Sequence, residues 1–497
     1  MRRRLRLSLG DALAAAGRGK EAAAAFLAAT SGASAAEALE LRRRAAEQQL
    51  ISGHIDEGLE TARSVLASIG LEMPRSIGQT LFGLIGKRLR LKLRGLRFRE
   101  RPADQVPAEL LLRIDSCRSI AMGLANVQPM LGMSFATSHL LYALEAGEPY
   151  RLSLALALEA AYSAAGGSKS HGRTAHLVEA ATALADQVDQ PHAQGMALFA
   201  TGIAHYFEGN IRRCLEFLGR ADILLRERCT GVSWELDTVL FYSLRALRQL
   251  GNVAQIRSLV PATLKDVIER GDLYAETCLR SAGLWLCELT DDRPEAALAE
   301  IETARSNWSQ EGFHPLHYVQ LGARVDIACY QGDGDRAWAT LEATWPRLER
   351  SQMLRFQLVS VDANNLRARA ALAAAAMPGK SAAAQKKLLA EAAKALTKAE
   401  GHRLEWARPY HQSGRAVLAA FRGDTEEAAE LLSHAAAGFD NGSFELQANL
   451  ARRRRGELLG GSKGAALVET ADAWLRKQGI QNPQRFAGSL SPGPWST

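Results

Sequence analysis

Residues 7–30 read LSLGDALAAAGRGKEAAAAFLAAT, two stretches of small and apolar residues joined by a glycine-containing turn. Gly10, Ala22 and Ala29 offer almost no side chain, whereas Phe26 is large. Two antiparallel helices need small residues where their backbones approach, and larger apolar residues where one hairpin packs on the next. The stretch therefore predicts a helical hairpin, with Phe26 packed between it and the hairpin that follows.

The same spacing recurs further along the chain. Twelve positions separate Gly10 from Ala22, and the same offset recurs from Gly202 and from Ala416. In each case a larger apolar residue follows four positions after the second member. The pattern resembles the tetratricopeptide repeat, although the Trp and Pro positions of that consensus are not met. The residues that we expect to make these repeat-packing contacts are Gly10, Ala22, Phe26, Gly202, Leu218, Ala428 and Leu432.

Turn signals divide the middle of the chain at regular intervals. They fall at Gly166-Gly167, Gly209-Asn210, Gly251-Asn252, Asp291-Asp292 and Gly332-Asp333-Gly334. Their spacing is roughly 41 residues, longer than a plain tetratricopeptide repeat, which indicates longer helices. The segments between them have apolar residues at helical spacing and no alternating β-branched runs. We predict an all-α, TPR-like α-solenoid, a right-handed superhelix of helical hairpins; the alternative is a bundle of separate helical domains.

Composition shifts suggest four parts within this array. RPADQVP (101–107) indicates a break after a basic block, and MPGKSAAAQ (377–385) indicates a loop before further helical pairs. The end of the chain is rich in Gly, Pro and Ser. We predict a basic N-terminal TPR-like block over 1–101, the main α-solenoid over 102–376, C-terminal TPR-like pairs over 377–478 and a flexible tail over 479–497.

The charge distribution, the cysteines and the N-terminal residues indicate the compartment in which the protein resides. The net charge is +7, but residues 1–101 hold 19 Lys+Arg against 10 Asp+Glu, so the remaining residues sum to −2. The six cysteines form no CxxC pair, which is typical of buried thiols in a reducing compartment. The basic start imitates a signal peptide, but Asp11 interrupts its apolar part. We expect a cytoplasmic protein.

The sequence carries no complete catalytic or metal-binding motif. Gly379-Lys380-Ser381 resembles the end of a phosphate-binding loop, but Ala374 stands where its first glycine belongs and no strand precedes it. His314 and His317 lack a third ligand nearby, and no GxSxG, HRD, DFG or GxGxxG motif occurs. We therefore predict no enzyme activity, no catalytic or metal-binding residue and no cofactor.

The most unusual segment is SIGQTLFGLIGKRLRLKLRGLRFRERP (76–102), in which cations alternate with leucines. One interpretation is a long helix whose leucines pack on the array, and we favour it. The others are contact with an anionic membrane or an acidic partner surface, and contact with nucleic acid, for which Phe98 alone could stack. As a partner-binding segment it would use Lys87, Arg88, Arg90, Lys92, Arg94, Arg97 and Arg99.

Several segments resemble the C-terminal helical region of large bacterial signalling proteins that carry a serine/threonine kinase domain, a STAND-type (AAA-like) ATPase domain and a tetratricopeptide-like superhelix. They are ELRRRAAEQQLISGHIDEGLE (40–60), RLRLKLRGLRFRERPADQVP (88–107), GEPYRLSLALALEAAYSA (147–164), CTGVSWELDT (229–238), ERGDLYAETCLR (269–280), WSQEGFHPLHY (308–318) and ADAWLRKQGIQNPQRFAGSL (471–490). The resemblance implies a detached or truncated regulatory arm that binds a protein or small effector. The kinase and nucleotide-binding motifs have no matching positions here, so no catalytic residue is carried over.

Two functions are therefore in competition. The first is a non-catalytic interaction or sensor scaffold in a bacterial kinase/ATPase signalling system, with a protein partner or a small-molecule effector in the concave surface of the solenoid. The alternative is the regulatory region of a transcriptional activator that contacts DNA through its basic N-terminal block. The net positive charge lies in the first fifth of the chain, so the alternative depends on that block alone.

Overall fold

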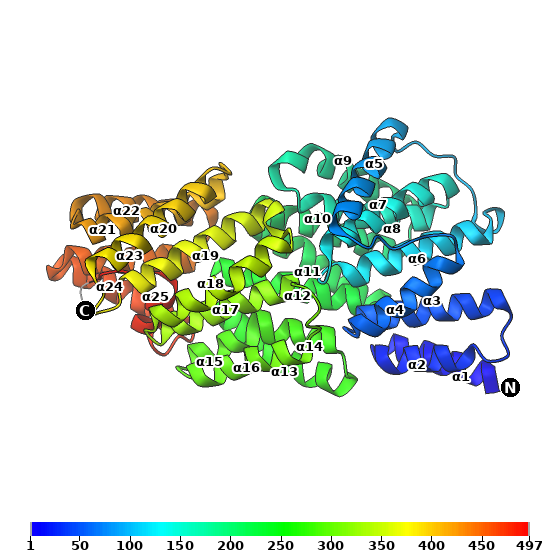
Figure 1. Ribbon diagram of the computed structural model, residues 1–497, viewed down its shortest axis with the longest axis horizontal. Helices are drawn as coiled ribbons and strands as arrows, with labels where there is room; N and C mark the ends of the chain where they lie inside the picture. Colours follow the sequence, from blue (N-terminus) through cyan, green and yellow to red (C-terminus); the bar gives the residue numbers. More distant parts are fainter. Residues whose placement is uncertain (1, 496–497) are drawn as a thin grey trace.

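The computed structural model describes residues 2–495; residue 1 and the last two residues of the predicted tail, 496 and 497, lie outside the described residues. Within this range the chain is all-α, with helices from α1 to α25 and no β-strand. Figure 1 shows the helices as an elongated array that runs from α1 and α2 at one end to α21–α24 at the other. The predicted fold class, an α-solenoid of helical hairpins, is confirmed; the hand of its superhelix stays a prediction.

The helices follow one another with short connections. The first part of the chain forms α1 (Arg2–Ala15), α2 (Gly19–Ala29), α3 (Ala35–Ile51), α4 (Ile55–Ser68), α5 (Ile77–Arg94), η1 (Ala103–Gln105), α6 (Ala108–Leu124) and α7 (Pro129–Ala146). The middle part forms α8 (Pro149–Ala164), η2 (Gly167–Ser170), α9 (His171–Val188), α10 (Pro191–Glu208), α11 (Ile211–Arg228), α12 (Ser233–Leu250), α13 (Val253–Arg270), α14 (Leu273–Leu279), η3 (Arg280–Leu284), α15 (Trp285–Thr290) and α16 (Pro294–Asn307). The last part forms α17 (Pro315–Tyr330), α18 (Gly334–Arg350), η4 (Met353–Arg355), α19 (Gln357–Ala375), α20 (Ala382–Glu400), η5 (Glu405–Ala407), α21 (Arg408–Arg422), α22 (Thr425–Gly442), α23 (Glu445–Leu459), α24 (Gly461–Lys477) and α25 (Pro483–Leu490).

Local sequence explains where many of these helices begin and end. Ser34 and Glu37 form a capping box at the start of α3, and a proline occupies the first turn of α7, α8, α10, α16 and α17. The turn signals seen in the sequence lie between the first and second helices of successive hairpins. Gly209 and Gly251 end α10 and α12 in the left-handed region, at φ 82° and 84°, which glycine adopts without a Cβ penalty.

The hairpins stack so that their first and second helices form two layers. In the pair α17/α18, the first helix has 13 buried residues of 16 and the second has 5 of 17. In α19/α20 the first has 14 of 19 and the second 4 of 19. The first helices therefore form the inner layer of the solenoid, and the second helices cover it from outside.

Small residues lie at the helix contacts. A Cβ added to Gly10 would come within 2.4 Å of the Phe26 ring, and one added to Gly202 would come within 2.7 Å of the Leu218 side chain. Phe26 is fully buried, in a cluster that also holds Leu41 of the next hairpin. Three other residues that the sequence singles out, Ala22, Ala428 and Leu432, are fully buried as well.

Segments that are far apart in the sequence also contact one another. The Tyr274 N–H donates to the Ser52 carbonyl, and the Ala254 N–H donates to Gln478 Oε1. The Ser168 N–H also donates to Gln357 Oε1. Successive parts of the solenoid are therefore in direct contact, and the C-terminal helices return to the middle of the chain.

Part of the segment predicted as a flexible tail, 479–497, is helical. Pro483–Leu490 form α25, which packs against α17. Phe486 is buried, and Ser489 Oγ donates to the Asp326 carbonyl. Composition alone predicted a loose end because the Gly, Pro and Ser content hides the few apolar residues that α17 covers.

The other predicted divisions stay predictions. η1 lies within the expected break at 101–107, and residues 377–381 form the turn between α19 and α20. Among the described residues, no helix is both long and apolar enough to cross a bilayer.

Candidate functional site

The inner layer encloses a cavity of about 230 Å³ in the second half of the chain. Its walls come from first helices, α12, α17, α19, α21 and α23, with contributions from α20, α22 and the segment after α25. The second helices α13, α18 and α24 contribute none of the lining residues. The cavity is therefore part of the concave surface of the solenoid, where the architecture predicts a recognition site.

A second cavity of about 120 Å³ adjoins the first, and its lining is mainly apolar and rich in aromatic rings. Its lining includes Tyr162, Phe199, Tyr206, Trp234, Phe241 and Tyr242. Arg245, Tyr318, Val319 and Leu358 line both cavities. The two cavities therefore share a wall, and we call them together the inner groove, with an aromatic section towards α8 and α10 and a polar section towards α19, α21 and α23.

Arg245 is the cation at the junction of the two sections. Its Nε donates to Tyr206 Oη at 2.8 Å, and the guanidinium lies 5.8 Å from the centre of the Phe241 ring. Among the described residues it forms no ion pair. Burial by itself would lower the pKa of Arg245, but the neighbouring Tyr206 and Asp362 outweigh burial and raise the pKa, so the guanidinium stays charged.

The opposite charge at this junction is Asp362. Tyr318 Oη donates to Asp362 Oδ2 at 2.6 Å, and within residues 2–495 this carboxylate has no cationic partner within ion-pair distance. Burial, together with the charge of Asp362, raises the pKa of Tyr318 well above its usual value, so the phenol keeps its proton and remains a donor. The junction thus presents an unpaired cation and an unpaired anion to the groove.

The remaining charged side chains of the polar section are paired with one another, two cations sharing one anion. Arg248 and Arg369 both pair with Asp326, whose side chain is almost fully buried. The Arg248 guanidinium lies 5.0 Å from the centre of the Trp285 ring. These side chains form a fixed wall of the groove.

Amide side chains of the polar section have no hydrogen-bond partner within the described chain. They are Gln249 on α12, Asn365 on α19 and Gln447 on α23, and each lines the larger cavity. Asn365 Oδ1, Gln447 Oε1 and the indole Nε1 of Trp406 are shielded from solvent and still have no protein partner. Buried polar groups are normally hydrogen-bonded, so these atoms are available to a ligand.

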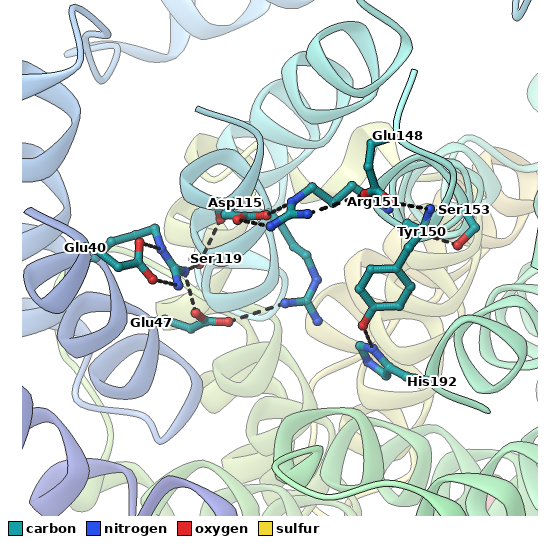
Figure 2. Close-up of polar contacts among 11 residues, drawn as sticks. Glu40, Glu47, Asp115, Ser119, Glu148, Tyr150, Arg151, Ser153 and His192 are labelled. Atoms are coloured by element: carbon teal, nitrogen blue, oxygen red, sulfur yellow. Dashed lines mark hydrogen bonds and ion pairs between the residues drawn. The ribbon is translucent and has the colours of Figure 1, made fainter. Parts of the chain in front are cut away.

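A second polar cluster lies where the N-terminal hairpins meet the main array, and its groups satisfy one another. Figure 2 shows Glu40, Glu47, Asp115, Ser119, Glu148, Tyr150, Arg151 and His192 within this cluster. Arg43 donates to Glu40 at 2.8 Å, to Glu47 at 2.7 Å and to Ser119 Oγ at 2.9 Å. Arg151 forms a bidentate pair with Asp115, at 2.8 and 2.9 Å.

The same cluster continues to α12. Arg118 donates to Glu235 Oε1 at 3.0 Å, and His192 Nε2 lies 3.1 Å from the same oxygen. Burial by itself would raise the pKa of Glu47 and Glu235, but the partners Arg43, Arg118 and His192 outweigh burial and lower both values. We call this cluster the junction network; it ties α3, α6, α8, α10 and α12 together, and none of its members lines the inner groove.

The cations of the predicted basic segment divide into two groups. Lys87 Nζ donates to Ser134 Oγ at 2.9 Å, Arg94 donates to the Leu144 carbonyl at 2.8 Å, and Arg88 is half-buried. Burial lowers the pKa of Lys87 and of Arg88. Arg90, Lys92, Arg97 and Arg99 are exposed. The structure therefore directs part of the segment inward and leaves part of it facing outward.

The weak motifs of the sequence have structural roles. Lys380 Nζ lies 2.5 Å from Asp335 Oδ1, and Ser381 caps α20 by accepting from the Ala384 N–H. Trp308 Nε1 donates to His314 Nδ1 at 2.9 Å, and burial lowers the pKa of His314 to about 4. In the part of the chain that the structure describes, no three or more His, Cys, Asp or Glu side chains gather closely enough to hold a metal ion.

The groove residues were not singled out by the sequence analysis. One signal was available, because Asn365 stands inside a helix, where asparagine is unfavourable unless packing or binding retains it. The contribution of α12 and α23 to one cavity had no such signal, since the two helices are far apart in the sequence.

Comparison with known proteins adds little to this description. No family model matches the chain, and no curated protein matches it. Among solved structures, a Rap protein complexed with competence and sporulation factor matches 89% of this chain and 99% of its own, at 12% sequence identity and a TM-score of 0.33. A likeness at that level supports no conclusion about function.

Proposed function

We propose that the chain is a non-catalytic interaction scaffold whose inner groove binds an extended segment of a partner protein. The observation that carries the proposal is a set of buried polar atoms, Asn365 Oδ1, Gln447 Oε1 and Trp406 Nε1, that have no hydrogen-bond partner among residues 2–495. An amide side chain offers one acceptor and a donor group together, which is the pattern of a peptide backbone.

The rest of the groove suggests which segment would fit. The aromatic section offers Phe199, Trp234 and Phe241 to an apolar side chain, and burying such a side chain contributes about 2 kcal/mol. Arg245 at the junction could receive an acidic side chain or a terminal carboxylate. A segment with an apolar anchor followed by an acidic residue therefore complements the groove in shape and charge.

The sequence resemblance supplies the proposed setting. As a regulatory arm of a bacterial kinase/ATPase signalling system, the scaffold would bind either the signalling module or an effector that controls it. A small effector could use the same groove, because the aromatic and polar sections adjoin. The four predicted parts of the chain are retained as a proposal, with the groove lined mainly by the second and third and also by residues 490–492 of the fourth.

Selection from a displayed library of random short peptides tests the proposal. The full chain should enrich peptides that combine an aromatic or large aliphatic residue with an acidic one. The selected peptides should bind an Asn365→Ala/Gln447→Ala variant at least about tenfold more weakly, because each substitution removes hydrogen bonds that the peptide makes in a desolvated site.

The matched control is Gln255→Ala on α13, an exposed amide on the outer layer. This variant should bind the selected peptides as the unchanged chain does. Failure to enrich any peptide, or equal affinity for the groove variant and the unchanged chain, would contradict a peptide-binding groove.

A further inference from the structure

The helix α5 has one face packed on the array and another that nothing in the described chain covers. Its inner face places Thr80, Leu84 and Leu91 against the neighbouring helices, and all three are buried. The main neighbour of α5 is α7, and Figure 1 shows α5 at the outer edge of the molecule. α5 therefore stands as a ridge on the surface.

The outer face of this ridge is apolar. Phe82 is 83% exposed, Ile85 66%, Leu89 56% and Leu93 81%. Their spacing of three, four and four positions puts them on one stripe of the helix. The stripe extends over about 16 Å, at 1.5 Å of rise per residue. Most of the large hydrophobic residues exposed elsewhere are scattered singly, which makes this stripe an unusual concentration.

Cations surround the stripe and no acidic residue interrupts it. From Met73 to Arg99 the sequence contains no Asp or Glu. Arg90 and Lys92 lie on the two sides of the stripe by helical position, and Arg97 and Arg99 follow its C-terminal end. These four side chains form no hydrogen bond or ion pair with other described residues, and all are exposed.

We propose that the outer face of α5 binds an anionic membrane surface. The apolar stripe would enter the boundary between headgroups and acyl chains, while the flanking cations contact lipid phosphates. The four inserted side chains supply the apolar area that such binding buries, and the outward cations supply the electrostatic attraction to anionic lipids.

The shape of α5 favours a lipid surface over the two other occupants that its charge allows. A protein partner would need both an apolar groove that receives the ridge and acidic groups on both rims of that groove to pair the cations. Nucleic acid would be bound through phosphate contacts alone, which leaves the apolar stripe facing water. A lipid interface buries the stripe and pairs the cations at the same time.

Co-sedimentation of the full chain with vesicles tests this inference. Binding to vesicles of phosphatidylcholine with phosphatidylglycerol should exceed binding to pure phosphatidylcholine, and it should weaken as salt is raised. Phe82→Ser/Leu93→Ser should reduce partitioning by at least about tenfold, because two inserted apolar side chains are lost. Arg90→Glu/Lys92→Glu should reduce the preference for anionic vesicles by a similar factor.

Ile223→Ser/Ile268→Ser is the matched control, because both residues are exposed apolar side chains on the outer helices α11 and α13. This variant should bind vesicles as the unchanged chain does. The inference is overturned if the full chain binds anionic vesicles no better than neutral ones, or if Phe82→Ser/Leu93→Ser binds vesicles as well as the control does. It is also overturned if the full chain binds duplex DNA or an acidic protein but no vesicle. These outcomes are independent of peptide binding in the inner groove.

Discussion

The junction network and the inner groove are both lined with polar side chains on first helices, yet they differ in one respect. In the junction network each buried charge meets an opposite charge, as Arg43 meets Glu40 and Glu47 and as Arg118 meets Glu235. In the groove, Asn365 and Gln447 keep buried oxygens without a protein partner, and Arg245 has no ion pair within the described chain.

This difference distinguishes polar groups that stabilise the fold from polar groups that are available to a ligand. A satisfied buried network holds helices in a defined arrangement, and breaking it leaves an uncompensated charge. An unsatisfied polar group already carries its desolvation cost, so a ligand that supplies the missing partner gains the hydrogen bond at little further cost. Substitutions should therefore destabilise the fold at the network and weaken binding at the groove.

The largest expected effect comes from removing Glu235. Glu235→Ala leaves Arg118 and His192 without their shared acceptor in a buried position, and should lower the free energy of unfolding by about 3 kcal/mol. Urea denaturation measures the change. Glu430→Ala, which removes an exposed carboxylate on α22, should stay within about 0.5 kcal/mol. Equal effects of the two substitutions would mean that the network is not structural.

A second expected effect is the loss of stability at low pH, which arises from buried histidines outside the junction network. Burial lowers the pKa of His139 and His317 to about 3. The unfolded chain, with a usual value near 6.5, binds protons that the folded chain cannot. Stability should therefore fall as the pH drops below about 6.5, by about 2 kcal/mol per histidine at pH 5.

His139→Leu isolates one of these groups. Both ring nitrogens of His139 are buried without a partner, so the substitution removes no hydrogen bond. The free energy of unfolding is measured at pH 7.5 and at pH 5 for both proteins. Its decrease between the two pH values should be about 2 kcal/mol smaller in the variant than in the unchanged chain. The same loss in both proteins would contradict a neutral buried imidazole.

Two glycines in the hairpin α10/α11 test how closely its two helices pack. Gly202→Ala should destabilise the chain by about 1–3 kcal/mol, since the new Cβ would meet the buried Leu218 side chain at 2.7 Å. Gly219→Ala on the partner helix has open space and should instead stabilise by about 0.5–1 kcal/mol. Thermal unfolding of both variants gives the comparison, and a shift in the same direction for both would contradict the close helix contact.

The smallest expected effect on stability is at the groove itself. Asn365→Ala removes no hydrogen bond to another described residue, so it should lower the free energy of unfolding by less than about 0.5 kcal/mol. Urea denaturation of both variants, Asn365→Ala and Glu235→Ala, under the same conditions measures the two changes. A loss comparable to that of Glu235→Ala would show that Asn365 supports the fold and would remove the distinction between the two regions.

The sequence predicted those features that depend on neighbours along the chain. Glycine at Gly209 and Gly251 is needed for a left-handed residue between two helices, and the structure has a turn at each. The contact of Gly10 with Phe26 lies within one hairpin, so its spacing was visible as a pattern. The tail could not be predicted in the same way, because α25 is held by α17, a helix about 150 residues earlier in the chain.

By itself, then, the sequence determined the class of fold and its repeat, since helix periodicity and turn glycines act over a few residues. Only the tertiary structure decided which polar groups are paired and which face a ligand. Glu235 and Asn365 are both polar residues of buried first helices, and their difference arises from side chains brought near them by distant segments. Hydrogen bonding is short-ranged, so whether a buried group is satisfied depends on the final packing and not on the local pattern.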